Sequence, residues 1–459
     1  MIGAEHVLTQ DLDAYTRDWR GKYHGTALAV LRPANTSQVR GLVRLCAREL
    51  VGIVPQGGNT GMCGASVPDG SGSQVVLTLS RLNRVRDIDA ANNTMTVDAG
   101  CVLQVLQEHA ADAGLLFPLS LGAEGSCQIG GNIATNAGGI QVLRYGNTRD
   151  LVLGLEVVLA NGEVLDLLRG LRKDNTGYDL KQCFIGSEGT LGIVTAATLK
   201  LFPAPSATAV AFAGMQSLDQ AVALLQHLKG RLGERFTAFE VISGATLELV
   251  CRYFPETPRP LAEAWPWHVL MEAADQGSHE ALVGALQAAL ESAMEAGHLE
   301  NVAVAASMAQ AGALWTMREN VTHAQQMDGA NIKHDIALPV SQIPAFVRET
   351  LPALAAAYPG SRPIVFGHLG DGNLHFNLSA PEGADITKWQ GQTDAVNKIV
   401  HDAVAGMRGS ISAEHGVGQL KRHELGLYKS AIELDAMRAI KQTLDPLGIM
   451  NPGKLLPAA

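Results

Sequence analysis

The sequence is poor in aromatic residues and has no long uncharged apolar run. Phe, Trp and Tyr make up only 5% of the 459 residues. No apolar stretch reaches the roughly 18 uncharged residues that a membrane-spanning helix needs, so we expect no transmembrane segment. Runs rich in lysine and arginine are also missing, and the net charge is −10. We therefore expect no nucleic acid and no anionic membrane as a partner, because both require a basic patch.

The six cysteines lack C-x-x-C spacing, which favours buried or half-buried thiols in a reducing compartment over a disulfide framework. The opening stretch MIGAEHVLTQDLDAY carries Glu5, Asp11 and Asp13 before the first arginine, Arg17. Acidic residues at these places argue against a secretory signal and a transit peptide. The sequence therefore predicts a cytoplasmic protein.

Glycine is abundant, with 49 residues, and much of it gathers in three loops. The loops cover residues 55–64 (PQGGNTGMCG), 118–139 (PLSLGAEGSCQIGGNIATNAGG) and 186–192 (GSEGTLG). Strand-like and helical segments lie between them. One such segment, residues 36–50, predicts an amphipathic helix capped by Thr36 or Ser37. Glycine loops expose backbone N–H groups that can bind phosphate oxygens, so a diphosphate cofactor is one interpretation and a set of surface turns is the other.

A histidine hairpin is predicted at residues 363–378, PIVFGHLGDGNLHFNL. The Asp371-Gly372 pair between two apolar runs is typical of a two-residue β-hairpin turn. That register places His368 opposite His375, and directly opposed Cβ atoms lie about 4.5–5.5 Å apart. The pair could therefore bind one metal ion. Two ordinary strand histidines are the alternative.

A carboxylate and a third imidazole stand side by side in residues 412–418, SAEHGVG. Neighbouring side chains of an extended segment point to opposite sides, so one of the two is a ligand and the other is not. We expect Glu414 to complete a three-ligand site with His368 and His375 that keeps one open position. Zn²⁺ fits this set best, and Mn²⁺ fits as well. His415 then acts as the general base.

A second group of polar residues precedes the hairpin. Arg318 and Thr322 are four residues apart on a helix predicted over residues 313–327, so they share one face. Lys333 lies on a strand predicted over residues 331–338, opposite the apolar side of that strand. An Arg fork and a Lys ammonium can bind a carboxylate. A solvated helix face beside a strand lysine is the alternative.

The motifs taken together resemble a known family. The strings VPQGGNTGMCGA, LGAEGSCQIGGNIATNAGG and GSEGTLGIV resemble the flavin-binding domain of the vanillyl-alcohol oxidase / p-cresol methylhydroxylase superfamily. FGHLGDGNLHFN, SAEHGVG and the ending LDPLGIMNPGKLLP resemble its D-2-hydroxyacid dehydrogenase branch. The likeness covers almost the whole chain, and the motifs are specific only in combination.

The resemblance implies an α+β protein. It consists of a two-subdomain FAD-binding domain of the PCMH type in residues 1–204 and a substrate- and metal-binding domain with an antiparallel sheet in residues 205–425. A C-terminal segment, residues 426–459, returns to the FAD domain. It also implies FAD held without a covalent bond, since the glycine loops contain no histidine, although Cys63 and Cys127 could in principle bond flavin. The implied FAD-binding residues are Pro55, Gly57, Gly58, Asn59, Thr60, Gly61, Ser120, Gly122, Gly125, Ser126, Gly130, Gly131, Asn132, Thr135, Glu188, Gly189, Ile193 and Asn451.

The implied reaction is a metal-assisted oxidation of a D-2-hydroxy acid to the 2-oxo acid, with an electron-transferring flavoprotein or a quinone as acceptor. The resemblance assigns substrate binding to Arg318, Thr322 and Lys333, and we add Asn377, beside His375, and His415. The metal would bind the α-hydroxyl and α-carboxylate of the substrate. Arg318, Thr322 and Lys333 would then be left to bind a second, remote carboxylate, which predicts a dicarboxylate such as 2-hydroxyglutarate or malate. A homodimer is compatible with the sequence. The alternatives are a D-lactate or glycolate dehydrogenase, an oxidase using O₂ and a non-enzymatic flavin-binding electron carrier.

Overall fold

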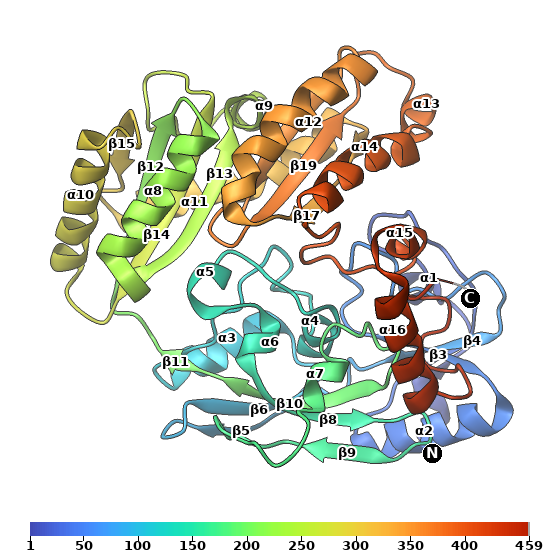
Figure 1. Cartoon of the computed structure of the whole chain (residues 1–459). Coiled ribbons are helices and arrows are strands. Elements are labelled where there is room, and N and C mark those ends of the chain that lie inside the picture. The colour runs from blue at the N-terminus through green and yellow to red at the C-terminus, as the bar shows by residue number, and fades with distance from the viewer. Residues whose placement is uncertain (458–459) are drawn as a thin grey trace. The chain divides into compact units, whose positions relative to one another are not determined.

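The chain folds into two compact units in the computed structural model, which describes residues 1–457. The first unit contains residues 1–138, 146–204 and those from Glu414 onward. The second contains Gly139–Tyr145 and Pro205–Ala413. The main part of the second unit thus begins at residue 205, where the second domain is expected, whereas the chain returns to the first unit at 414 rather than at 426. In Figure 1 the colour bar allows the three parts of the first unit to be followed along the sequence.

The first unit contains two main sheets. The four-stranded sheet has the order β1 (Val7–Leu8), β2 (Ala27–Leu31), β4 (Gln74–Thr78), β3 (Gly52–Gln56), parallel except for β1. The five-stranded sheet is antiparallel, with the order β5 (Val85–Asp89), β6 (Thr94–Asp98), β10 (Ile193–Lys200), β8 (Val152–Val158), β9 (Val164–Leu167). A short pair joins β7 (Leu115–Leu116) to β11 (Phe202–Pro203).

Helix α2 (Thr36–Glu49) buries Val39, Leu42, Val43 and Cys46, which is the predicted apolar face. Its N-cap is Asn35 rather than Thr36 or Ser37, because the Asn35 side chain accepts a hydrogen bond from the N–H of Gln38. The other helices of this unit are η1 (Ala4–His6), α1 (Asp13–Thr16), α3 (Leu103–Asp112), α4 (Ile129–Thr135), α6 (Thr148–Leu151), α7 (Lys181–Phe184), α15 (Arg422–Tyr428) and α16 (Ala431–Leu444).

The C-terminal segment completes the first unit. Ile53 of β3 donates its N–H to the carbonyl of Ile449 at 2.8 Å, and Asn451 donates its N–H to the carbonyl of Ile53 at 2.8 Å. The last part of the chain therefore lies along the open edge of β3. The segment predicted to return to the first domain thus lies in the first unit.

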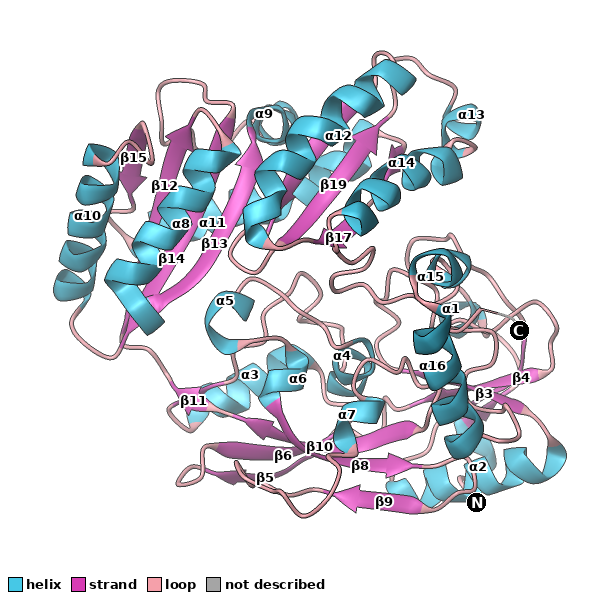
Figure 2. Cartoon of the chain, in the orientation of Figure 1, coloured by secondary structure: helices cyan, strands magenta, loops and turns pink. Residues whose placement is uncertain are grey.

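One antiparallel sheet forms the centre of the second unit. Its order is β15 (Asn301–Val304), β12 (Ala207–Met215), β14 (Trp267–Asp275), β13 (Phe236–Ser243), β18 (Arg362–Gly367), β19 (Asn373–Ser379), β16 (Asn331–Ile332), and β17 (Asp335–Ala337) also pairs with β19. Figure 2 shows these strands in magenta with helices on both faces. The predicted α+β domain with an antiparallel sheet is confirmed.

Helices α8 (Leu218–Leu232), α10 (His279–Glu295), α12 (Ile343–Ala357) and α14 (Thr393–Gly406) cover one face of this sheet. Helices α9 (Gly244–Tyr253) and α11 (Met308–Asp328) pack on the other face around a core that includes Phe212 and Leu270. The remaining short helices are α5 (Val142–Tyr145), η2 (Gly233–Arg235), η3 (Val340–Gln342) and α13 (Ile386–Gln390). No helix within residues 1–457 is both long and apolar enough to cross a bilayer.

The hairpin of β18 and β19 forms, but its register differs from the prediction. Phe366, not His368, pairs with His375, and residues 368–372 form a longer loop. The physical reason is that this loop turns into the protein. Leu369 is completely buried, and the N–H of Gly370 bonds the carbonyl of Phe239 at 3.2 Å. A tight Asp-Gly reversal would have left Leu369 in the ladder and away from that contact.

The strand predicted over residues 331–338 is interrupted. It forms two short strands, β16 and β17, with Lys333 and His334 between them. Ile332, Ile336 and Leu338 are buried, as the predicted alternation requires. The interruption arises because the side chain of Asn377 accepts a hydrogen bond from the N–H of His334 at 3.0 Å, which takes the place of a ladder bond.

Candidate functional site

The first unit contains a pocket lined by all three glycine-rich segments and by the C-terminal segment. Its empty volume is about 950 Å³, including space open to solvent. The predicted FAD-binding residues that line it are Pro55, Gly57, Gly58, Asn59, Thr60, Gly61, Gly130, Gly131, Asn132, Thr135, Glu188, Gly189, Ile193 and Asn451. The predicted residues Ser120, Gly122, Gly125 and Ser126 do not line it.

The part of the second loop that contains Ser126 packs against the first loop and does not line the pocket. A Cβ on Gly58 would lie 2.0 Å from the carbonyl oxygen of Ser126, so the two loops touch backbone to backbone. Only glycine permits this approach. Ser126 therefore contributes to the shape of the pocket without lining it.

Three buried amide oxygens in the pocket have no protein partner within residues 1–457. They are Oε1 of Gln128, Oδ1 of Asn132 and Oδ1 of Asn451, and all three residues line the pocket. Buried polar atoms are normally hydrogen-bonded, so such atoms in a pocket indicate a ligand that carries hydrogen-bond donors. A flavin ring and its nucleotide supply such donors, and glycine N–H groups suit the diphosphate. The pocket therefore fits FAD.

Three non-glycine pocket residues, Asn59, Glu188 and Asn451, adopt left-handed backbone conformations, with φ of 55°, 52° and 44°. Such conformations are uncommon outside glycine and cluster at functional sites. They persist here because hydrogen bonds hold these residues. Nδ2 of Asn451 donates to the carbonyls of Ala65 and Glu188 at 3.0 and 2.7 Å. The C-terminal segment is thereby fixed against the first and third glycine loops.

The Glu188 carboxylate fixes the segment that carries His415. It accepts hydrogen bonds from the N–H groups of Val417 and Gly418, each at 2.7 Å. Burial raises the pKa of Glu188, and these two bonds oppose that rise. His415 itself lines the flavin pocket. The predicted general base thus stands in the wall of the predicted cofactor site.

Cys63 and Cys127 also line the pocket. Burial raises the pKa of the Cys127 thiol, which keeps it protonated and poorly nucleophilic. The thiol of Cys63 donates to the carbonyl of Gly416 at 3.3 Å. Neither environment favours a covalent bond to flavin.

In the second unit, Arg318 lies beside a buried carboxylate that the sequence analysis does not include. Nε and Nη2 of Arg318 contact Oε2 of Glu240 at 2.8 and 2.7 Å. Nδ1 of His368 lies 2.5 Å from Oε1 of the same carboxylate. Burial would raise the pKa of Glu240, but the charges and hydrogen bonds of His368 and Arg318 lower it to about 2. Glu240 is therefore ionised and joins a predicted substrate residue to a predicted metal ligand.

The ring of Phe366 contacts both Arg318 and His375 of β19. The guanidinium carbon of Arg318 lies 4.8 Å from the centre of the Phe366 ring, which is a cation–π contact. Phe366 in turn lies 4.8 Å, centroid to centroid, from His375. The rings of His368 and His375 are 5.6 Å apart despite the changed hairpin register. The side chains of Arg318, His368 and His375 are therefore neighbours.

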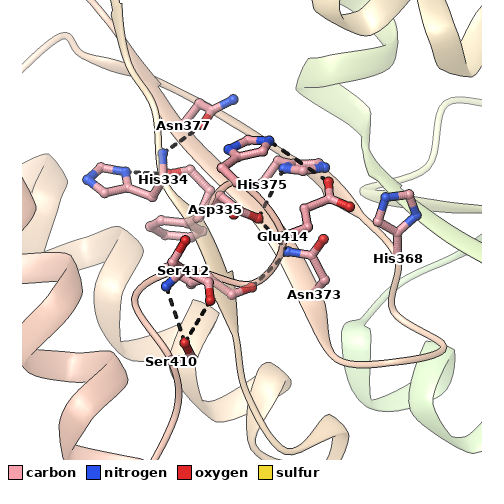
Figure 3. Close-up of polar contacts among 12 residues, drawn as sticks. His334, Asp335, His368, Asn373, His375, Asn377, Ser410, Ser412 and Glu414 are labelled. Atoms are coloured by element: carbon pink, nitrogen blue, oxygen red, sulfur yellow. Dashed lines mark hydrogen bonds and ion pairs between the residues drawn. The ribbon is translucent and has the colours of Figure 1, made fainter. Parts of the chain in front are cut away.

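Asp335 of β17 stands beside His375. One of its carboxylate oxygens is 4.0 Å from Nδ1 of His375, and it accepts a hydrogen bond from the side chain of Asn373 at 3.0 Å. The N–H of Ala413 bonds the carbonyl of Asp335 at 3.2 Å, and Glu414 is the next residue along the chain. Chain continuity thus brings Glu414 to this strand, as Figure 3 shows.

A group that could hold a metal ion follows from this arrangement. Asp335, His375, Glu414 and His415 each offer one ligand atom, and these atoms lie within 4.8 Å of one another. Two carboxylates and two imidazoles suit Zn²⁺ or Mn²⁺. His375 and Glu414 are in this group, whereas the predicted ligand His368 is outside it. The complete ligand set stays a prediction.

The other predicted substrate residues differ in how exposed they are. Thr322 and Lys333 are half-buried. Asn377 is buried, and its amide already bonds the N–H of His334 and Oε1 of Gln325. The roles of these three residues in substrate binding stay predictions.

The comparisons with known proteins agree with this geometry. The family of FAD linked oxidases, C-terminal domain, matches residues 204–455, and the FAD binding domain family matches residues 27–168. The chain belongs to the FAD-linked oxidase family. It is therefore an FAD-dependent oxidoreductase, and the pocket of the first unit lies in its FAD-binding domain.

Related proteins are similar over nearly the whole chain. A D-2-hydroxyglutarate dehydrogenase of Xanthomonas citri pv. viticola is 41% identical over 97% of this chain and 92% of its own length. The mitochondrial D-2-hydroxyglutarate dehydrogenase of Bos taurus is 40% identical over 98% of this chain and 80% of its own length. A putative mitochondrial D-lactate dehydrogenase of Schizosaccharomyces pombe is 37% identical over 97% of this chain and 84% of its own length.

Solved structures of the same fold belong to more distant proteins. A p-cresol methylhydroxylase with substrate bound has a TM-score of 0.78 at 16% identity and covers 99% of this chain and 95% of its own. An alkyldihydroxyacetonephosphate synthase has a TM-score of 0.73 at 17% identity and covers 98% of this chain and 84% of its own. The predicted PCMH-type fold of this FAD-linked oxidase is confirmed.

Sequence reasoning missed Glu240, Asn373 and the ligand role open to Asp335. Glu240 is a lone acidic residue in the apolar strand AFEVIS, and a single charge inside a buried strand is a signal that could have been used. Asn373 could not be recognised, because its role depends on the strand pairing that places it beside Asp335. In this FAD-linked oxidase the tertiary contacts therefore add residues to the site that the motifs do not contain.

Proposed function

We propose that this FAD-linked enzyme oxidises D-2-hydroxyglutarate to 2-oxoglutarate. D-Malate, a shorter dicarboxylate of the same class, is a further candidate. The observation that carries the proposal is a buried arginine, Arg318, within the same cluster of side chains as His375 and Asp335. The D-2-hydroxyglutarate dehydrogenases that share about two fifths of the sequence support this choice.

Different residues bind the two ends of the substrate. Arg318, Thr322 and Lys333 bind the remote carboxylate. Glu240 occupies the Nε and Nη2 edge of Arg318, so the substrate meets the Nη1 end. Asn377 contributes its amide to the α-carboxylate. These groups fix which carbon is presented for oxidation and favour a second carboxylate over the methyl group of lactate.

His415 removes the hydroxyl proton from C2 as the general base. His375, Glu414 and Asp335 are the residues that would hold a divalent ion, with His368 as the remaining predicted ligand. When bound, such an ion would supply Lewis acidity at the hydroxyl oxygen, and non-covalent FAD would take up the C2 hydride, which leaves a 2-oxo acid. The proton goes to His415 and the electron pair to the cofactor, so the step is balanced.

A D-lactate dehydrogenase is the second candidate, because the relative from Schizosaccharomyces pombe carries that description. The two candidates differ in what Arg318 is for. A monocarboxylate leaves a buried cation without a substrate partner, whereas a dicarboxylate supplies one. This contrast favours the dicarboxylate.

Anaerobic reduction of the bound flavin tests the proposal. The purified holoenzyme is mixed with D- and L-2-hydroxyglutarate, D-malate, D-lactate and glycolate, and the flavin absorbance is followed while metal content is measured in the same sample. We expect the fastest bleaching with D-2-hydroxyglutarate. Faster bleaching with D-lactate would assign the second candidate, and no bleaching with any 2-hydroxy acid would refute both.

The electron acceptor is proposed to be an electron-transferring flavoprotein or a quinone. Peroxide formation in air would instead identify an oxidase. A cytoplasmic location and a homodimer remain predictions of the sequence.

A further inference from the structure

We infer that Glu240 is a positioning residue whose one carboxylate holds both Arg318, the predicted substrate arginine, and His368, the metal ligand predicted from the sequence. The inference rests on the proposed function and extends it to a residue of strand β13. The two carboxylate oxygens of Glu240 contact different partners. Oε2 accepts hydrogen bonds from Arg318, and Oε1 faces Nδ1 of His368. Among residues 1–457, Glu240 is the acidic side chain that forms an ion pair with Arg318 within 4.0 Å.

All three side chains are almost completely buried, with 0% of Glu240 and 7% each of Arg318 and His368 exposed. A buried charge is costly unless it is paired, so the carboxylate and the guanidinium must remain together. Burial also removes the freedom of both partners to choose other positions. The ring plane of His368 and the fork of Arg318 are therefore set by the same group.

The contact with Nδ1 also decides which nitrogen of His368 can bind a metal. A metal-binding histidine commonly donates its other ring N–H to a carboxylate, which fixes the tautomer and raises the basicity of the ligand. With Nδ1 on Glu240, Nε2 is the ligand nitrogen. The neighbouring ring of His375 lies 5.6 Å away, centroid to centroid, so Nε2 and a nitrogen of His375 can serve one ion.

Because Arg318 and His368 share the Glu240 carboxylate, metal binding and substrate binding should both depend on Glu240. Loss of Glu240 weakens metal binding through His368 and loosens the arginine that receives the remote carboxylate. A purely structural ion pair would change only stability. Metal affinity and the separate responses of KM and kcat therefore distinguish a positioning role from a structural one.

The matched control is Glu272 on the adjacent strand β14. Its side chain is half-buried and also accepts a hydrogen bond from α11, from Nε1 of Trp315 at 3.0 Å, with a second bond from Thr237 at 2.9 Å. It contacts neither Arg318 nor His368. Replacing Glu272 with Gln keeps an oxygen that can accept from Nε1 of Trp315, and the new amide NH₂ can donate to the hydroxyl of Thr237.

The experiment compares Glu240→Gln with Glu272→Gln in the flavin-loaded chain. Zn²⁺ affinity is measured by competition with a chromophoric chelator, without turnover, and steady-state kinetics on D-2-hydroxyglutarate follow at saturating Zn²⁺. For Glu240→Gln we expect Zn²⁺ affinity to fall about 10- to 100-fold, and at saturating Zn²⁺ we expect kcat to recover while KM stays raised. Glu272→Gln should behave like the wild type.

Equal Zn²⁺ affinity in wild type and Glu240→Gln would overturn the inference while leaving the proposed function intact. A wild-type chain that binds no divalent ion would instead overturn the metal-assisted function and the inference with it. If Glu240→Gln does not fold, the double variant Glu240→Gln/Arg318→Gln removes both buried charges and is compared with the single variant Arg318→Gln. A lower Zn²⁺ affinity in the double variant supports the inference, and equal affinity refutes it.

Discussion

The carboxylate of Glu188 accepts the backbone N–H of Gly418 at 2.7 Å, and the neighbouring N–H of Val417 at the same distance. The acidic side chain comes from the third glycine loop and the two amides come from the segment that follows His415. A residue predicted to bind FAD thus also holds the predicted general base in place. The same carboxylate connects the cofactor pocket to the residue that would take the substrate proton.

Replacing Glu188 with Ala should lower kcat more than it lowers flavin content. Both amides lose a charge-assisted acceptor, and a small misplacement of a catalytic group can cost on the order of 100-fold in rate. Steady-state kinetics and the flavin-to-protein absorbance ratio measure the two effects. Glu433→Ala is the control, because Glu433 also accepts a backbone N–H, from Ser430, but lies on the surface of α16. Unchanged kcat in Glu188→Ala would contradict the positioning of His415 by this contact.

Replacing Arg318 with Lys should affect dicarboxylates more than lactate. A lysine cannot contact Glu240 through two nitrogens and also present a further donor to a substrate carboxylate. We expect kcat/KM on D-2-hydroxyglutarate to fall at least about tenfold, which corresponds to about 1.4 kcal/mol. The value for D-lactate should change less. An equal loss on both substrates would show that Arg318 does not read the remote carboxylate.

Removing the metal should stop turnover without releasing the flavin. The pocket is lined by residues of the first unit, whereas two of the four candidate metal ligands, Asp335 and His375, belong to the second and none of the glycine loops contributes a ligand. Dialysis against a chelator should therefore leave the visible flavin spectrum intact while activity falls to background, and added Zn²⁺ or Mn²⁺ should restore it. Full activity in a chain shown to be metal-free would refute the metal-assisted mechanism.

Replacing Gly58 with Ala should reduce flavin binding. The new Cβ would lie 2.0 Å from the carbonyl oxygen of Ser126, so the first glycine loop has to move away from the second. We expect a lower flavin-to-protein ratio after purification. Gly70→Ala is the control, since a Cβ on Gly70 has no neighbour within 4 Å. Normal flavin content in Gly58→Ala would mean that the loops can separate without harm to the pocket.

The acid side of the stability curve should depend on His268. Burial lowers the pKa of His268 to about 4, below its ordinary value of about 6.5. Between these values the unfolded chain binds a proton that the folded chain does not, so stability falls as the pH drops through this window, by at most about 3 kcal/mol. Denaturant unfolding of His268→Gln between pH 7 and pH 4 should show a shallower fall. His279→Gln, a change at an exposed position, should keep the wild-type slope.

Local pattern was sufficient for much of the fold. The apolar spacing at Val39, Leu42, Val43 and Cys46 correctly predicted the buried face of α2, because helix periodicity depends only on nearby residues. The glycine loops correctly indicated one pocket, since their backbone groups serve whichever ligand they surround. The cap of α2 was placed one or two residues too late, at Thr36 or Ser37 instead of Asn35, which is the usual scale of error at helix ends.

The candidate site was harder to predict, because it depends on register and on contacts distant in sequence. The Asp371-Gly372 pair indicated a tight turn, but burial of Leu369 favoured a longer loop and moved Phe366 opposite His375. Glu240 is 78 residues from Arg318 and 128 from His368. No local pattern connects positions so far apart, so only the folded structure could reveal their shared contact.

The C-terminal pairing of Ile449 and Asn451 with Ile53 bears on biosynthesis. The chain is made from its N terminus. The backbone groups of Ile53 on β3 therefore lack these hydrogen-bond partners until the second unit has been translated. His415 and Asn451 can reach the cofactor pocket only after the second unit has been translated. FAD is therefore expected to bind stably only after residue 451 has been made, and nascent chains truncated before Glu414 should remain colourless.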